Sequence, residues 1–310
     1  MGGLRLAASG SGGFNTSVIP PDADTFSSDD PSSEGFLGAV QRYTALILGM
    51  ILTGLVMSLA LGSTLSLRGV PSPLVSQAIA PMSAALTVIA CLGVSFAIAV
   101  GVAKIVNPAV GTFVLGAGIG TLALGSGGYL DVLFAGGAGL STGIETLIWG
   151  GMVLVMASGI YRLTGPLPDQ PDQPVSDAIC PRAVFSAPAV KASMAGLLAL
   201  LAVLLFASND LKGQALAAAV IAGSVTGHVG RVLAPSVQPI LLYATPCVVL
   251  ALGQMWAFQG DSDDVIRSWM QGGPRLGIPT PIDVAAGALM GVSMGIGFSR
   301  GVVEAHLKGG

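Results

Sequence analysis

The sequence is short of charge. Asp, Glu, Lys and Arg make up 9% of its 310 residues, with 16 acidic and 13 basic side chains. Soluble domains carry roughly a quarter charged residues, so this balance argues against a soluble globular protein. The basic residues form no stripe with interleaved aromatic residues, which are only 5% of the chain. Nucleic acid is therefore not an expected partner.

Cysteine is also scarce. The three cysteines, Cys91, Cys180 and Cys247, stand far apart and form no C-x-x-C pair. This spacing indicates neither a disulfide framework nor a zinc site. The familiar motifs for nucleotides, haem, flavin and metalloprotease zinc are missing too, so we expect no cofactor and no catalytic residue.

Apolar residues and glycine take their place. The chain is 52% hydrophobic and contains 45 glycines, and its apolar runs reach the length of about 20 residues that a membrane-spanning helix needs. We expect an all-α polytopic protein of the cell membrane, with about eight transmembrane helices in contact with the lipid bilayer. The expected spans are 45–67, 78–103, 108–125, 141–160, 190–207, 213–229, 236–257 and 281–298.

Polar stretches divide these runs into parts. Residues 1–40 begin with a segment rich in Ser, Gly, Pro and Asp, which predicts a disordered cytoplasmic tail. The linker 165–188 is rich in proline and acidic residues. It separates residues 41–164 from residues 189–310, each with four expected spans.

One helix sequence occurs twice. Residues 141–162 read STGIETLIWGGMVLVMASGIYR, and residues 279–300 read PTPIDVAAGALMGVSMGIGFSR. The matched pairs are Thr142 and Thr280, Glu145 and Asp283, Met152 and Met290, Met156 and Met294, and Arg162 and Arg300. Shorter matches precede both copies in the same order, as in 104–110 and 231–237. We therefore predict two tandem four-helix repeats, related by an axis along the membrane normal because each repeat has an even number of spans.

The paired acids are the best candidates for a binding site. Carboxylates within a span are costly and often mark a cation or proton pathway. Hydroxyls lie one turn earlier at Thr142 and Thr280, so Glu145 and Asp283 could belong to an oxygen-ligand site for a hard cation. The alternative is that both acids are interfacial first-turn residues, favoured by the helix dipole.

Other patterns predict packing. Small residues four apart let helices approach closely, and we expect this role for Gly116, Gly120, Gly223, Gly227, Gly291 and Gly295. The methionine pairs are expected to fill the core, since thioethers alone make a poor metal site.

Residues 139–143 fit G-x-S-x-G, and His228 lies on another span, which together resemble intramembrane serine proteases. The expected topology places Ser141 and His228 near opposite membrane surfaces, so hydrolysis is a remote alternative.

The distribution of Lys and Arg predicts the orientation. Both termini are expected in the cytoplasm, because cytoplasmic segments carry the excess of basic residues. Facing inward would be Arg5, Arg42, Lys104, Arg162, Arg182, Lys191, Arg231, Arg300 and Lys308, against Arg68, Lys212, Arg267 and Arg275 outside. Glu145 and Asp283 then lie near the outer ends of their helices.

Three stretches resemble a known family. Val106-Asn-Pro-Ala-Val110, followed by Gly136-Gly-Ala-Gly-Leu-Ser-Thr-Gly143, is similar to a C-type membrane subunit of the archaeal sodium-translocating tetrahydromethanopterin:coenzyme M methyltransferase. Leu276-Gly-Ile-Pro-Thr280 resembles the same family stretch. The resemblance implies an ion-conducting subunit of a larger complex, with sodium as its ion and with methyl-transfer chemistry on other subunits.

The favoured function is transport of a small cation or a cation-coupled solute. The ion would bind past the paired acids at the interface of the repeats, and one repeat would rock against the other. The alternative is a non-transporting membrane scaffold or assembly subunit, since glycine-rich helix faces can also serve contacts with other subunits or within a homo-oligomer.

Overall fold

The computed structural model describes residues 31–135, 140–168, 181–257, 264, 267, 271 and 275–309. Within these ranges the chain is helical, and the only extended pairing is an isolated antiparallel bridge between Leu65 and Pro71. In the described part of the chain, eight helices are long and apolar enough to cross a membrane. The expected all-α polytopic membrane fold is therefore confirmed.

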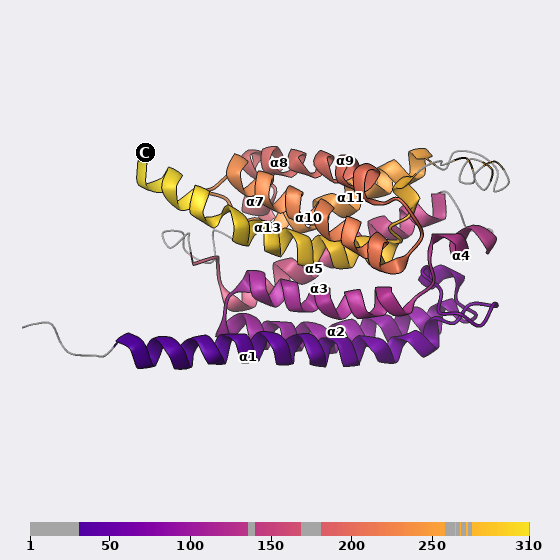
Figure 1. The fold of residues 1–310 in the computed structure, drawn as a ribbon, viewed down its shortest axis with the longest axis horizontal. Helices are drawn as coiled ribbons and strands as arrows, with labels where there is room; N and C mark the ends of the chain where they lie inside the picture. The colour runs from indigo at the N-terminus through magenta and orange to yellow at the C-terminus, as the bar shows by residue number, and fades with distance from the viewer. Residues whose placement is uncertain are drawn as a thin grey trace, which may run out of the picture. The chain divides into compact units, whose positions relative to one another are not determined.

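The eight spans lie close to the expected ranges (Figure 1). In chain order they are α1 (Pro31–Ser58, continued by the 3-10 helix Leu59–Thr64), α2 (Pro81–Ile105), α3 (Pro108–Gly125), α5 (Leu140–Thr164), α8 with α9 (Ala187–Ser193 and Leu197–Phe206), α10 (Lys212–Leu233), α11 (Ile240–Ala257) and α13 (Pro281–Gly309). Shorter elements are η2 (Val75–Gln77), α4 (Tyr129–Phe134), α7 (Pro181–Val184), η3 (Met194–Gly196) and η4 (Arg275–Gly277).

Two polar segments are only partly described. Of the expected tail 1–40, residues 1–30 lie outside the described residues, whereas Pro31 opens α1. Of the expected linker 165–188, residues 169–180 lie outside them, and α7 and the start of α8 occupy its end. Cys180 falls in the part that is not described.

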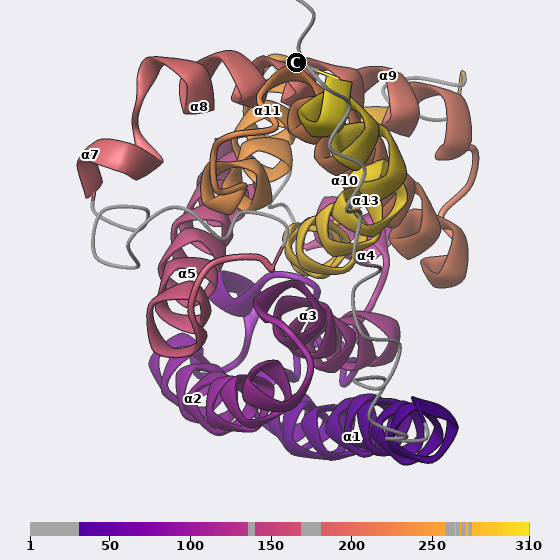
Figure 2. The ribbon, with the colours of Figure 1, turned by 90° about the vertical axis from the view of Figure 1, so that its left-hand side faces the viewer.

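Four helices form the centre of the bundle. Within the unit from Gln41 onward, α3 packs on α13, α11 packs on α5, and α13 also contacts both α5 and α11. The end-on view in Figure 2 places α2 and the part of α1 from Gln41 onward on one side of this group and α8 and α9 on the other. The large side chains buried here include those of Trp149, Tyr161, Tyr243 and Leu289. Burial of large apolar side chains stabilises the fold.

The closest helix pair is α10 with α13. A Cβ atom added at Gly227 would lie 2.5 Å from the Val292 carbonyl oxygen, and one at Gly295 would lie 2.6 Å from the His228 backbone nitrogen. Gly223 and Gly291 also face backbone of the opposite helix. The two helices run in the same direction, because Lys212 meets Asp283 near both starts and His228 lies beside Gly295 further along.

The outer helices present apolar side chains to their surroundings. On α2, Met82 and Leu86 are exposed, and on α9 so are Leu201 and Leu205. Exposed apolar side chains on a helix of spanning length are what contact with lipid requires, since the hydrocarbon of a bilayer is itself apolar.

Candidate cation site and polar core

Asp283 lies in the first turn of α13, and its carboxylate is completely buried. Its Oδ2 atom accepts hydrogen bonds from the Thr280 backbone N–H at 2.9 Å and from the Thr280 hydroxyl at 2.6 Å. Pro281 follows Thr280, so the helix begins with the residue types that favour a helix start. Asp283 therefore caps the start of α13.

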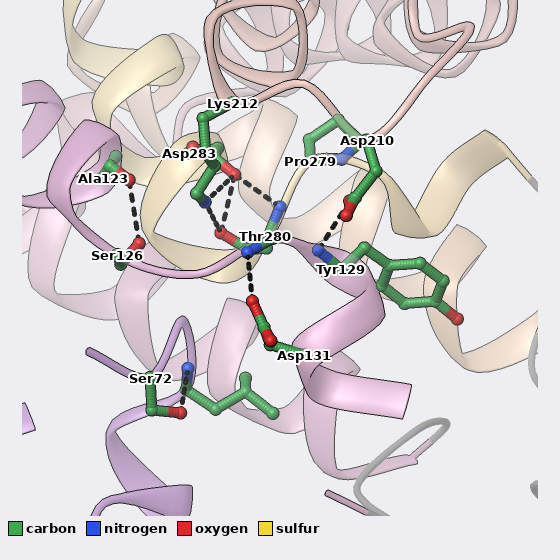
Figure 3. Close-up of polar contacts among 12 residues, drawn as sticks. Ser72, Ala123, Ser126, Tyr129, Asp131, Asp210, Lys212, Pro279, Thr280 and Asp283 are labelled. Atoms are coloured by element: carbon green, nitrogen blue, oxygen red, sulfur yellow. Dashed lines mark hydrogen bonds and ion pairs between the residues drawn. The ribbon is translucent and has the colours of Figure 1, made fainter. Parts of the chain in front are cut away.

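Lys212 gives Asp283 a second role. Its ammonium lies 2.9 Å from Asp283 Oδ2 and donates to the Thr280 hydroxyl at 3.2 Å (Figure 3). A lysine at a helix start is disfavoured by the helix dipole, and Lys212 opens α10. The carboxylate of the neighbouring helix offsets that cost. The lysine side chain is 16% exposed and the aspartate 0%, so the ammonium lies between the acid and the surroundings.

The second carboxylate oxygen of Asp283 is unsatisfied. Among the described residues, Oδ1 is buried and has no hydrogen-bond partner. Leaving a buried acceptor unpaired costs about 1–3 kcal/mol, and more when it is charged. The site therefore has capacity for one further donor, proton or cation.

Glu145 lies in a different setting. Its Oε1 accepts from the Val75 backbone N–H at 2.7 Å, and its Oε2 accepts from the Ser76 hydroxyl at 2.7 Å and the Ser76 N–H at 3.3 Å. It ties α5 to the segment before α2. Glu145 and Asp283 have no hydrogen-bond partner in common, and Glu145 lies in the second turn of α5, whereas Asp283 lies in the first turn of α13.

The two threonines also differ. Thr280 contacts Asp283 and Lys212 directly, whereas Thr142 is buried and its carbonyl accepts the Thr146 hydroxyl at 2.9 Å. The structure thus brings together Asp283 and Thr280 of the four predicted ligands. Their matched partners Glu145 and Thr142 lie on α5.

A buried amide connects the starts of α5 and α13. Gln254 on α11 accepts from the Thr146 hydroxyl at 2.7 Å and donates to the Pro279 carbonyl at 3.0 Å. Both contacts lie at one end of the bundle, where α5, α10 and α13 begin; we call it the Asp283 end.

Four hydroxyls meet in the core toward the opposite end. Thr112 Oγ1 lies 2.9 Å from the Tyr243 hydroxyl and 2.8 Å from the Ser293 hydroxyl, and the Tyr161 and Tyr243 hydroxyls are 3.4 Å apart. These residues come from α3, α11, α13 and α5, and we call them the hydroxyl cluster. A cavity of about 280 Å³ is lined by Ser293 and also by Asn107 and Arg300. We call this the Arg300 end of the bundle.

Loops of the two halves join at the Asp283 end. Asp210, just before α10, accepts from the Tyr129 N–H at 2.7 Å and so caps α4. Asp131 on α4 forms an ion pair with Arg68 at 2.9 Å. Burial raises the pKa of the Asp210 carboxyl, and the two backbone N–H groups that it accepts oppose that rise.

The structure separates Ser141 from His228. Ser141 opens α5 near Gln254 and Pro279, while His228 lies beside Gly295. Gly295 is sixteen residues beyond Pro279, roughly 24 Å along a helix. No serine–histidine dyad forms between them. Among the described residues, no three His, Cys, Asp or Glu side chains gather as a metal site.

The predicted packing glycines lie where helices meet. Gly116 faces Leu289 and Met290 of α13, and Gly120 faces the Met290 methyl group. Gly223, Gly227, Gly291 and Gly295 form the contact between α10 and α13.

Sequence reasoning did not single out Lys212, Gln254 or the hydroxyl cluster. Lys212 was assigned to the outer surface by the charge rule alone, and a basic residue at the start of a span could have been paired with an acid of another span. Polar residues such as Gln254 and Thr112 within apolar runs give a similar signal.

Comparisons with protein-family models, with curated protein sequences and with solved structures find no match to this chain.

Proposed function

We propose that this chain transports a small cation, or a solute coupled to one, and that Asp283 is the carboxylate that binds the ion. The observation that carries the proposal is the state of that carboxylate. One oxygen is held by Thr280 and Lys212, and the other is buried without a partner among the described residues. A carboxylate buried in a span in this way is costly, and function is the usual reason for that cost.

Lys212 acts in this proposal as an internal cation. Its ammonium and an incoming ion are both attracted to the same carboxylate and to the Thr280 hydroxyl, so the two compete. Ion binding displaces the ammonium, and ion release lets it return. Oxygen atoms of Asp283 and Thr280 are suitable ligands for a hard cation.

The polar groups of the core support a route through the bundle centre. Gln254 and Thr146 lie near the Asp283 end, and the hydroxyl cluster lies toward the Arg300 end, next to the cavity that reaches Ser293. All of these residues belong to α3, α5, α11 and α13. The route would therefore run between the first four and the last four spans.

The packing of these helices also supports two related halves. A two-fold relation that exchanges the halves would exchange α3 with α11 and α5 with α13. It would turn the observed contact of α3 with α13 into the observed contact of α11 with α5. Rocking of one half against the other is then the proposed movement. In the proposed orientation the Asp283 end is extracellular, and the sodium-translocating family that the sequence resembles makes Na⁺ the first ion to test.

Thermal unfolding of the purified protein in detergent tests the site. The protein is scanned in Na⁺, K⁺, Li⁺ and Ca²⁺ and across pH, together with Asp283→Asn and Lys212→Met. An ion at about 100 times its dissociation constant stabilises the native state by roughly 2.7 kcal/mol. We expect one ion to stabilise the wild type and not Asp283→Asn. Lys212→Met should bind the same ion more tightly, because its competitor is gone.

Matched variants at the same end serve as controls. Asp210→Asn removes another carboxylate and is expected to keep the ion effect, and Glu145→Gln shows whether the second predicted acid contributes. Ion flux into vesicles is then measured for active variants. Unchanged flux and unchanged ion dependence in the combined Glu145→Gln and Asp283→Asn variant would overturn the proposal. Absence of any ion effect together with stoichiometric partners on purification would favour the scaffold instead.

A further inference from the structure

A second cavity opens between α2 and α5, apart from the Asp283 site. It has a volume of about 290 Å³ and is lined mostly by apolar side chains of these helices. Met82 and Ile148 on its rim are 77% and 57% exposed. Because both helices are of spanning length, the mouth of this cavity faces the hydrocarbon of the membrane.

Glu145 contributes the one acidic group of its wall. The residue is 7% exposed, and three donors from Val75 and Ser76 converge on its carboxylate. These hydrogen bonds hold the carboxylate in a fixed position in the wall of the cavity. The cavity therefore combines an apolar body with a fixed acidic group.

Glu145 has no ion-pair partner in the part of the chain that the structure describes. Ion pairs among the described residues include Lys212 with Asp283 and Arg68 with Asp131. Lys212 supplies a positive charge beside Asp283, whereas no described residue supplies one beside Glu145. Opposite charges attract more strongly away from bulk water, so a positively charged group that enters this cavity gains most from contact with Glu145.

The position of Glu145 below the membrane surface limits which ligands can reach its carboxylate. Glu145 is five residues from the start of α5, roughly 7.5 Å along the helix. A headgroup near the membrane surface can reach this depth while its tail follows Val88, Ile89 and Met152. The volume is near the lower end of the usual range for ligand pockets, about 300–1,000 Å³, which suits one hydrocarbon tail.

We propose that the cavity between α2 and α5 binds a single-tailed amphiphile with an ammonium head, with Glu145 as the group that recognises the head. The ligand enters sideways from the membrane. This site is separate from the cation site of Asp283 and does not depend on transport.

Quenching of Trp149 tests this proposal, because Trp149 lines the cavity. Trp256→Phe and Trp269→Phe leave Trp149 as the only tryptophan of the chain. The protein in phosphatidylcholine vesicles is titrated with 12-bromododecylamine, with 12-bromododecanol and with 12-bromododecanoate, each expressed as its measured fraction in the membrane. We expect saturable quenching by the amine at a membrane fraction about tenfold lower than for the alcohol, a ratio that corresponds to about 1.4 kcal/mol.

Three variants in the single-tryptophan protein decide the outcome. Glu145→Gln is expected to remove the preference for the amine, Asp283→Asn to keep it, and Ala85→Phe to abolish saturable quenching by filling the cavity. Equal quenching by amine and alcohol in the wild type would overturn the proposal and indicate a site for ordinary lipid tails. Absence of saturable quenching by any of the three would overturn it as well, and would indicate that this face is covered, for example by a second copy of the chain. Because Ala85→Phe keeps the acid, it tests the cavity even if Glu145→Gln fails to fold.

Discussion

From the contact between α10 and α13 we predict that alanine substitutions at two glycines of α13 differ in their effect on the stability of the protein. Gly295 faces the backbone of α10, and a Cβ there would lie 2.6 Å from the His228 nitrogen and 3.0 Å from the Gly227 carbonyl carbon. Gly297, two residues later, has no atom within 4 Å of the same position. We therefore compare Gly295→Ala with Gly297→Ala.

The magnitudes follow from two terms. Replacing glycine by alanine within a helix gains about 0.5–1 kcal/mol, because the unfolded chain loses conformational freedom. At Gly297 this gain stands alone. At Gly295 the Ser224 carbonyl oxygen is even nearer than the His228 nitrogen, so the methyl group must push backbone aside by about 1 Å or more to reach an ordinary separation of about 3.5 Å. Such overpacking costs typically 1–3 kcal/mol. We expect Gly295→Ala to lower stability by about 1–2 kcal/mol or more, and Gly297→Ala to leave it unchanged or raise it.

The measurement is reversible unfolding in mixed detergent micelles, with circular dichroism as the readout of helix content. Both variants are compared with the wild type under identical conditions. If the two variants had equal stability, α10 and α13 would not approach at Gly295 as the structure describes, and the argument from close packing would be refuted.

Three further predictions concern polar contacts. Lys212→Met or Asp283→Asn alone should lower the stability of the protein by roughly 3 kcal/mol, as for other buried ion pairs with one member removed. The double variant should lose less stability than the sum of the two single variants. Additive losses in a double-mutant cycle would contradict the pairing. Burial raises the pKa of Asp210, so the folded protein holds this proton more tightly, and the stabilisation is present below pH 4 and is lost as pH rises through the raised pKa. Relative to Asp210→Asn, which keeps an acceptor for Tyr129, the wild type should therefore lose thermal stability as pH rises above about 4, and a constant difference would be the contrary result. Thr112→Val should cost roughly 0.5–2 kcal/mol because it removes the hydroxyl that joins three helices. Thr121→Val is the control, because the Thr121 hydroxyl donates to the Ala117 carbonyl of its own helix.

The spans could be predicted from the sequence because they depend on local properties. An apolar run of sufficient length satisfies its backbone only as a helix in lipid, and 108–125 begins after Asn107, which caps α3 by accepting from the Val110 N–H at 2.9 Å. The glycine pairs predicted close packing for the same local reason. The partner of each glycine face was not predictable, since spacing within α13 does not say which helix lies against it.

The cation site was predictable only in part. Asp283 and Thr280 stand out as an acid and a hydroxyl one turn apart in a span. Lys212 precedes Asp283 by 71 residues in the chain, and its contact depends on how α10 packs against α13. Repetition of the helix suggested that Glu145 would share this setting, but its surroundings come from Val75 and Ser76, which the second copy does not repeat. α4 was missed because six residues are too few to show a period.

The glycine contact between α10 and α13 also limits how the Lys212 ammonium can move away from Asp283. With backbone against backbone from Gly223 to Gly295, the two helices that carry Lys212 and Asp283 cannot separate without breaking most of their packing. The ammonium must therefore leave the carboxylate by rotation about its own side-chain bonds, a movement of picoseconds to nanoseconds in exposed residues, whereas collective movements of domains take microseconds to milliseconds. In the proposed mechanism an ion at Asp283 therefore exchanges by movement of the lysine side chain alone, and the rearrangement of the helices is a separate, slower step.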